Sequence, residues 1–248
     1  MRRFVPALLI ALAAAPLAAA ELTTLSTNAI RGPLLALAEQ FKTGSGDTVK
    51  IDFDTSTSIA RRMAAGESAD VLVSTTAAVA QAIKEGKAIA DSRVYVGKMA
   101  IAAAIRPGAR RPDLTNVETL KASILQADAI LYSQGSSGVY ILSMLRDLGI
   151  ADQVKAKAVQ LPTGADMLKR IAASSGNELG FTQLSEIKEH DGHGITLVGV
   201  LPAAVQSYTS FDAVVLSGAR APAAARAFVR SIAAPPARKL LTAAGWEF

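Results

Sequence analysis

Short apolar runs alternate with segments of helical periodicity along nearly the whole chain, and this alternation limits the fold more than any other feature. It is typical of α/β proteins, in which helices cover the faces of a mostly parallel sheet. Nine runs are predicted to be strands: Leu22–Leu25, Val49–Phe53, Val71–Ser74, Met99–Ile105, Ala129–Tyr132, Ala158–Leu161, Leu179–Thr182, Ile195–Val198 and Ala213–Leu216. Helices are expected between them, with apolar stripes or boundary signals in six segments: Leu34–Phe41, Ile59–Met63, Val139–Leu148, Met167–Ala172, Pro222–Ile232 and Pro236–Ala244.

Two breaks in composition divide the mature chain. The run Arg106–Pro112 is rich in Pro, Gly and Arg, and it suits a crossing between two lobes. The polar stretch Gln206–Phe211 suits the return. We therefore expect two Rossmann-like lobes with a ligand cleft between them. Lobe 1 is predicted to comprise residues 21–98 and 211–248, and lobe 2 residues 99–210.

The first twenty residues have the pattern of a secretory signal peptide. Arg2 and Arg3 precede the apolar run Val5–Leu17, and small residues then lead to Ala20. The apolar run is too short for a transmembrane anchor. We expect cleavage after Ala20 and export to the periplasm.

Charge and cysteine content exclude several classes of function. Removing Arg2 and Arg3 from the 26 basic residues leaves 24 against 21 acidic ones, a net charge of +3 on the mature chain. The basic residues are dispersed and aromatic residues make up 5% of the chain, so no nucleic-acid surface is indicated. The chain has no cysteine, which excludes disulfides, a thiolate metal site and a cysteine nucleophile.

Hydroxyl-bearing residues follow four of the predicted strands. In open α/β sheets, ligands bind at the carboxyl ends of the parallel strands. The helices that follow begin there, and their N-termini offer unpaired N–H groups to an anion. Ser, Thr and Asn are also the preferred helix N-caps, so each segment alone is explained by capping. Together they predict an uncharged, donor-rich anion pocket built from Ser26–Asn28, Thr55–Ser58, Ser133–Gly138 and Pro162–Gly164.

Motifs for catalysis are weak. His190 and His193 lie three residues apart beside carboxylates, which suits a metal, but an exposed turn explains them better because no third ligand is indicated. Ser136 and Ser137 could serve an exported hydrolase, although the spacing of a nucleophile elbow is missing. We therefore expect a protein that is not an enzyme, has no cofactor and has no direct metal ligands.

Four segments carry a family resemblance that runs over nearly all of the mature chain: Leu34–Phe41, Ser56–Arg61, Ala64–Ser74 and Gly138–Gly149. The chain resembles the periplasmic molybdate-binding proteins of ABC importers. That resemblance implies the type II periplasmic binding protein fold and an oxyanion held by neutral donors between the lobes.

The resemblance implies these ligand-binding positions: Asn28, Ala29, Ser56, Ser137, Ala165 and Gln183. Ala29 stands where the family has a serine and Gln183 where it has a tyrosine, so two positions depart from the molybdate pattern. Arg31, beside the first loop, is a further candidate because a guanidinium would suit a carboxylate or phosphonate.

We expect the substrate-binding component of an ABC importer, monomeric, which binds molybdate or tungstate and delivers it to an inner-membrane permease. A binding protein for a small organic carboxylate or phosphonate remains open, as does a receptor domain. The alternative from another class is an exported serine-type hydrolase.

Overall fold

The computed structural model describes residues 19–248, so the predicted signal peptide lies almost wholly outside the described residues. The described strands are β1 (Glu21–Thr27), β2 (Thr48–Asp54), β3 (Val71–Thr75), β4 (Val94–Ile105), β5 (Ala129–Ser133), β6 (Ala158–Leu161), β7 (Glu178–Gln183), β8 (Thr196–Val200) and β9 (Tyr208–Val215). The helices are α1 (Arg31–Ser45), α2 (Ser56–Ala64), α3 (Thr76–Lys84), α4 (Val117–Gln126), α5 (Ser136–Asp147), α6 (Ala151–Val154), α7 (Gly164–Ala173), α8 (Leu184–His190), α9 (Pro222–Ile232) and α10 (Pro235–Ala243). All nine predicted strands are confirmed, as are the predicted helical segments.

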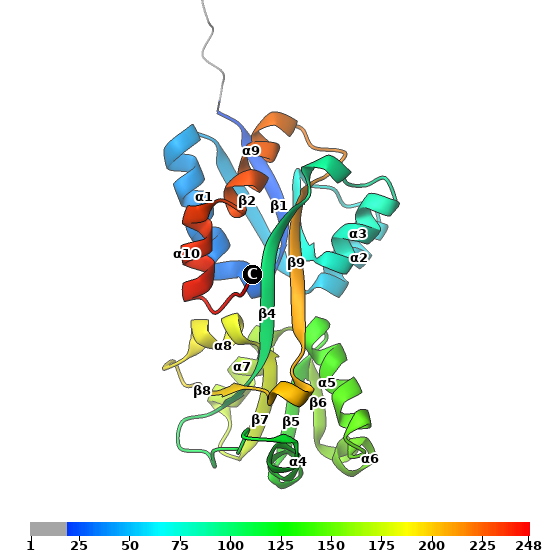
Figure 1. The fold of residues 1–248 in the computed structure, drawn as a ribbon, viewed down its shortest axis with the longest axis vertical. Helices are drawn as coiled ribbons and strands as arrows, with labels where there is room; N and C mark the ends of the chain where they lie inside the picture. The colour runs from blue at the N-terminus through cyan, green and yellow to red at the C-terminus, as the bar shows by residue number, and fades with distance from the viewer. Residues whose placement is uncertain (1–18) are drawn as a thin grey trace, which may run out of the picture.

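The strands form two lobes joined through β4, which pairs with strands of both (Figure 1). In lobe 1, β1 pairs in parallel with β2 and β3, and β9 runs antiparallel beside β3. In lobe 2, β5 pairs in parallel with β6 and β7. Helices cover both faces of each sheet, as the alternation of elements predicts.

The chain crosses between the lobes inside strands. Residues 94–100 of β4 pair with β9, whereas residues 101–105 pair with β7 and β8. The predicted lobe limits fall inside β4 and β9, which both run from one lobe toward the other (Figure 1). The run Arg106–Pro112, expected to accompany the crossing, instead lies beyond the far end of β4, where Arg106 donates to the backbone carbonyls of Gly176 and Ser175. That expectation was wrong because the strand itself spans both sheets.

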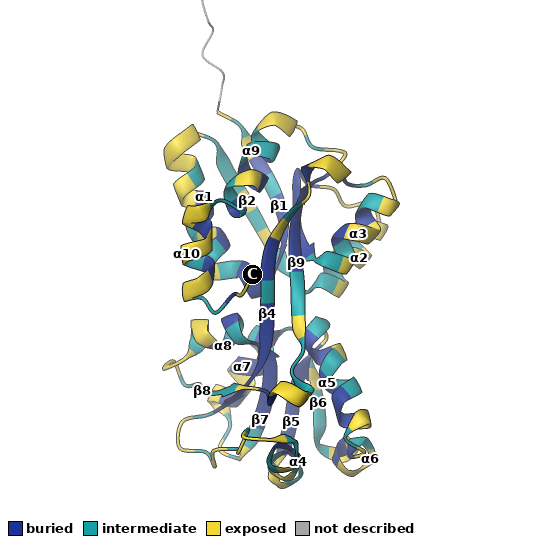
Figure 2. Ribbon diagram, viewed as in Figure 1, coloured by how far each residue is buried: buried dark blue, intermediate teal, exposed yellow. Residues whose placement is uncertain are grey.

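Each lobe has its own core on both faces of its sheet. In lobe 1, Phe211, Phe228 and Trp246 pack on one face, and Ile59 and Val79 on the other. The central strands β3, β5 and β7 are mostly buried, whereas β2, β6 and β8 and the outer helix faces are partly or fully exposed (Figure 2). Within residues 19–248, no helix has the length and apolarity needed to cross a bilayer.

Asp70, in the motif before β3, stabilises lobe 1 from within. Its carboxylate is 1% exposed and accepts the Thr23 N–H at 2.7 Å, the Thr23 hydroxyl at 2.8 Å and the Arg220 N–H at 2.6 Å. Burial by itself would raise the pKa of Asp70, but these hydrogen bonds outweigh burial and lower it. The aspartate therefore ties β1, the start of β3 and the turn after β9 together.

Candidate functional site

A cavity lies between the lobes, at the carboxyl ends of the parallel strands. Its volume is about 30 Å³, well below the range of about 300–1,000 Å³ typical of small-molecule sites. Its lining is Thr27, Asn28, Ala29, Asp54, Thr55, Ser56, Ser133, Gly135, Ser136, Ser137, Gly164, Gln183, Glu186 and Phe211. Among residues 19–248, this lining includes no Arg, Lys or His, so the donors that an anion would meet are hydroxyls, amides and backbone N–H groups, and the carboxyl groups of Asp54 and Glu186 lie beside them.

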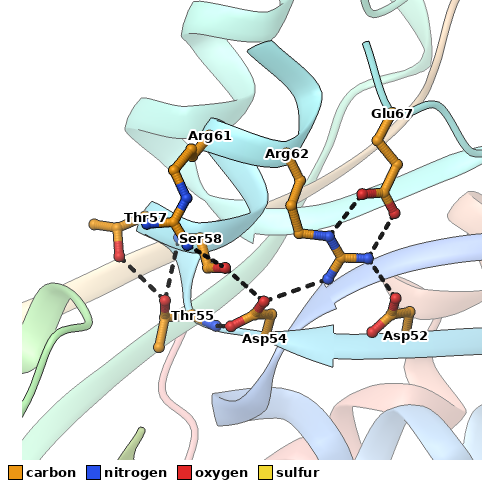
Figure 3. A network of polar contacts seen from close by, with 8 residues as sticks. All are labelled: Asp52, Asp54, Thr55, Thr57, Ser58, Arg61, Arg62 and Glu67. Atoms are coloured by element: carbon orange, nitrogen blue, oxygen red, sulfur yellow. Dashed lines mark hydrogen bonds and ion pairs between the residues drawn. The ribbon is translucent and has the colours of Figure 1, made fainter. Parts of the chain in front are cut away.

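The lobe 1 wall is the start of α2. Thr55 caps the helix by accepting the Ser58 N–H at 3.2 Å, which leaves the N–H groups of Ser56 and Thr57 without a helical partner. Asp54 accepts the Thr55 N–H at 2.7 Å and the Ser58 hydroxyl at 2.6 Å. These contacts fix the first turn of α2 against the end of β2 (Figure 3).

Arg62 stabilises this turn through ion pairs with three carboxylates. Its guanidinium lies 3.3 Å from Asp54 and pairs with Asp52 and Glu67 (Figure 3). Burial would raise the pKa of Asp54, but the hydrogen bonds from Ser58, the Thr55 backbone and Arg62 together lower it. Asp54 is therefore an ionised structural acceptor at the edge of the cavity.

The lobe 2 wall begins at α5. Its N-cap, Gly135, has no side chain to cap the helix, so the first N–H groups of α5 are free to meet a ligand. Gly138 permits this close approach: a Cβ there would overlap the carbonyl oxygen of Ser133 and lie 2.8 Å from its carbon. A larger residue would push Ser136 and Ser137 away from the cavity.

A third helix, α7, begins at Gly164 beside Glu186 of α8. Glu186 accepts a short hydrogen bond from the Thr182 hydroxyl. A Cβ on Gly164 would lie 2.8 Å from that hydroxyl and closer still to the Glu186 carboxylate. Gly164 therefore allows the carboxyl group to sit directly against the start of α7.

Desolvation raises the pKa of Glu186 above the ordinary glutamate value of 4.5, although the hydrogen bond from Thr182 works in the opposite direction. Solvent still reaches part of the side chain, which is half-buried. A carboxyl group of this kind holds a proton at a pH where ordinary carboxylates have lost theirs. Lobe 2 therefore places a proton carrier in the cavity wall.

Hydrogen bonds join the two lobes around the cavity. Thr57 donates to the Gln134 carbonyl at 3.2 Å, and Ser185 donates to the Ala29 carbonyl at 2.6 Å. Gln183, at the end of β7, donates to the hydroxyl of Thr209 on β9 at 3.0 Å. The structure is thus a closed arrangement in which both lobes contribute to one cavity.

The structure brings five of the predicted ligand positions to the cavity lining: Asn28, Ala29, Ser56, Ser137 and Gln183. Ala165 lies one residue beyond the lining residue Gly164. Arg31 is not in the lining; its guanidinium carbon lies 4.2 Å from the centre of the Phe53 ring. Their roles in binding stay predictions.

The histidines do not assemble a catalytic or metal site in the part of the chain that is described. His190 Nδ1 lies 2.9 Å from the Glu186 carbonyl oxygen, and His193 Nδ1 lies 3.2 Å from that of Asp191. Residues 19–248 contain no group of three or more His, Cys, Asp or Glu that could hold a metal ion. Within the same range neither histidine is bonded to Ser136 or Ser137, as a serine hydrolase would require.

Sequence reasoning missed both acidic residues of the lining. Asp54 is the last residue of β2, and Glu186 follows the end of β7 by three residues. The rule that placed ligands at strand ends would have found both, but we followed only the hydroxyls and amides. No sequence pattern indicates that Glu186 becomes desolvated, because only the folded structure places Gly164 and Thr182 against its carboxyl group.

Residues 22–247 match the family described as bacterial extracellular solute-binding protein. An aconitate isomerase from Pseudomonas sp is 33% identical over 246 residues, which cover 94% of this chain and 92% of the relative. This match overturns our expectation of a protein without enzymatic activity, because a relative over the whole fold is an enzyme.

Solved structures establish the fold. The periplasmic molybdate-binding protein of Azotobacter vinelandii superposes with a TM-score of 0.75 and 20% identity, covering 92% of this chain and 99% of its own. The sulfate-binding protein SubI of Mycobacterium tuberculosis gives a TM-score of 0.73 and 18% identity, covering 92% and 86%. The predicted periplasmic binding protein fold is confirmed, and the chain belongs to the bacterial extracellular solute-binding protein family.

Proposed function

We propose that this protein is an exported isomerase that holds aconitate, a small unsaturated tricarboxylate, in the cavity between its lobes and interconverts its cis and trans forms. The similarity to an aconitate isomerase over 94% of the chain supports this proposal. Export still rests on the predicted signal peptide, residues 1–20. The proposed ligand is an organic carboxylate, the alternative raised by the sequence, and not molybdate. The permease partner and the monomeric state stay predictions.

One observation carries the proposal: the cavity lining combines uncharged donors with an acid of raised pKa. Helices α2, α5 and α7 all begin at this cavity, at Ser56, Ser136 and Gly164. Helix N-termini favour anions through their free N–H groups and the positive end of the helix dipole. Three such termini supply donors for three carboxylate groups, and Glu186 supplies a group that can move a proton.

A carboxylate suits this lining better than molybdate does. Ala29 has no hydroxyl to donate, and the Gln183 amide already donates to Thr209. Molybdate exchanges no proton at a carbon atom, so a carboxyl group that carries a proton has no chemical role in binding it. A substrate that exchanges a proton at carbon makes use of the same group.

The chemistry needs one proton carrier and stabilisation of charge. The aconitate double bond cannot rotate, but removing a proton from the neighbouring methylene spreads the electron pair over an allylic system and its carboxylates. The helix N-termini then face oxygen atoms on which negative charge increases, which lowers the barrier. Returning the proton completes the reaction without an oxidant or a second substrate.

The test is conversion of pure trans-aconitate and of pure cis-aconitate by the purified protein, followed by chromatography. We expect both to reach the same mixture, and Ser56→Ala or Ser137→Ala to raise KM. Ser45→Ala, at the exposed end of α1, is the matched control and should behave as wild type. Stabilisation by molybdate together with no turnover of aconitate would refute the proposal.

A further inference from the structure

Two acidic side chains line the cavity, one from each lobe, and they differ in what surrounds them. Asp54, on the lobe 1 wall, accepts hydrogen bonds from Ser58, from the Thr55 backbone and from Arg62 (Figure 3). Each of these contacts favours the ionised form. Asp54 already accepts three hydrogen bonds that favour its ionised form, so it is a weak base and would bind a substrate proton only weakly.

Glu186, on the lobe 2 wall, is in the opposite position. Within residues 19–248, the one side-chain hydrogen bond to its carboxylate comes from Thr182, and no ion pair reaches it. Burial raises its pKa, which moves its proton affinity toward neutral pH. An acid–base group works best when its pKa lies near the working pH, because it then both accepts and releases a proton.

The charged groups around Glu186 are few. On its own helix, Glu189 raises the pKa of Glu186 and His190 lowers it, both by charge. On α7, the Asp166 carboxylate accepts the Thr163 hydroxyl at 2.7 Å. Lys188, also on α8, is occupied elsewhere: its ammonium donates to the Ala243 carbonyl at 2.8 Å. Burial and the hydrogen bond from Thr182 thus act more strongly on Glu186 than any charge does.

We propose that Glu186 is the acid–base catalytic residue of the cleft and that Thr182 and Gly164 are the positioning residues that hold its carboxyl group against the start of α7. This inference rests on the proposed function. In the reaction, a methylene C–H bond of aconitate breaks and the proton moves to the Glu186 carboxylate. The electron pair enters the allylic system. The Glu186 O–H bond then breaks, and its proton forms a new C–H bond at the other end of that system.

Glu186→Gln tests the assignment directly. The amide resembles the protonated carboxyl group in shape but carries no transferable proton, so kcat should fall by about 10²–10⁴-fold. Aconitate binding, measured by calorimetry, should stay within a few-fold of wild type. Glu189→Gln, one turn away on the exposed side of the same helix, is the matched control and should keep kcat within a few-fold.

The pH profile separates catalysis from a structural role. Thr182→Val removes the hydrogen bond that lowers the pKa of Glu186, so the acidic limb of kcat/KM should move to higher pH. Glu189→Gln removes the charge that raises this pKa, so the same limb should move to lower pH. A glutamate that only supports the fold would leave the limb unchanged in both variants, and that result would overturn the assignment.

Deuterium uptake gives a second measurement that needs no net conversion. In D₂O, wild type should exchange methylene protons of bound aconitate, whereas Glu186→Gln should bind aconitate without exchange. Exchange or turnover at the wild-type rate in Glu186→Gln would overturn the role of Glu186 and leave the proposed function standing. Absence of turnover in the wild type would instead overturn the proposed function. Glu186→Asp, with the carboxyl group retracted by one methylene, should recover part of the exchange.

Discussion

Replacing Asp70 by Asn tests how a buried carboxylate stabilises lobe 1. The carboxylate accepts three hydrogen bonds of 2.6–2.8 Å from Thr23 and the Arg220 backbone. Asn keeps one acceptor oxygen and turns an NH₂ group toward N–H donors, which leaves buried donors unpaired. Breaking a buried charged network of this kind costs about 3–5 kcal/mol of unfolding free energy. For a chain of this length, that corresponds to a fall in Tm of about 6–20 °C.

Urea unfolding monitored by the fluorescence of Trp246, the single tryptophan, reports on the same lobe. Because the native pKa of Asp70 is lowered, its contribution is complete above the ordinary value of 3.8 and is lost as pH falls through the native pKa. The gap between wild type and Asp70→Asn should therefore narrow in acid. Asp91→Asn, which breaks an exposed pair with Arg226, is the control and should cost no more than about 1 kcal/mol. A loss below about 1 kcal/mol for Asp70→Asn, or one independent of pH, would refute the reasoning.

Two further predictions concern the cavity walls. Gly138→Ala should cost about 1–3 kcal/mol in urea unfolding and raise KM, because the new methyl group overlaps the Ser133 carbonyl. Gly44→Ala, in open space on α1, should instead stabilise by about 0.5–1 kcal/mol, and equal effects of the two changes would contradict this account. Glu186→Gln should become more stable than wild type as pH rises above 4.5, since the raised pKa of Glu186 opposes folding once the unfolded chain ionises; a pH-independent difference in Tm would argue against it.

Local pattern predicted every strand and most helices. Each strand contains a short apolar run, and six of the ten described helices are marked by apolar stripes, caps or terminal glycines and prolines. The crossing between the lobes was harder to place. The alanine-rich end of β4 continues without a break into the second sheet, and the loop Arg106–Pro112, which looks like a linker, only closes the far end of lobe 2.

For the site, too, the sequence predicted some features correctly and misplaced others. Polar residues at strand ends indicated a donor-rich cavity, and Ser56 and Ser137 do line one. Gln183 also lines it, but only the family resemblance indicated that position. Arg31 was placed near that cavity by its position in the chain, but its guanidinium stacks on Phe53 instead. Distance along the sequence does not determine the direction in which a long side chain points.

The sequence by itself determined which segments become strands and helices, where helices begin, and which residue types could meet an anion. These properties depend on neighbours within a few residues, through periodicity, capping and backbone conformation. Only the tertiary structure decided which strand ends meet, and it brought Gly164 and Thr182 against Glu186. The proton affinity of a carboxyl group depends on burial and on partners distant in sequence, so the properties of this site arise when the two lobes close around it.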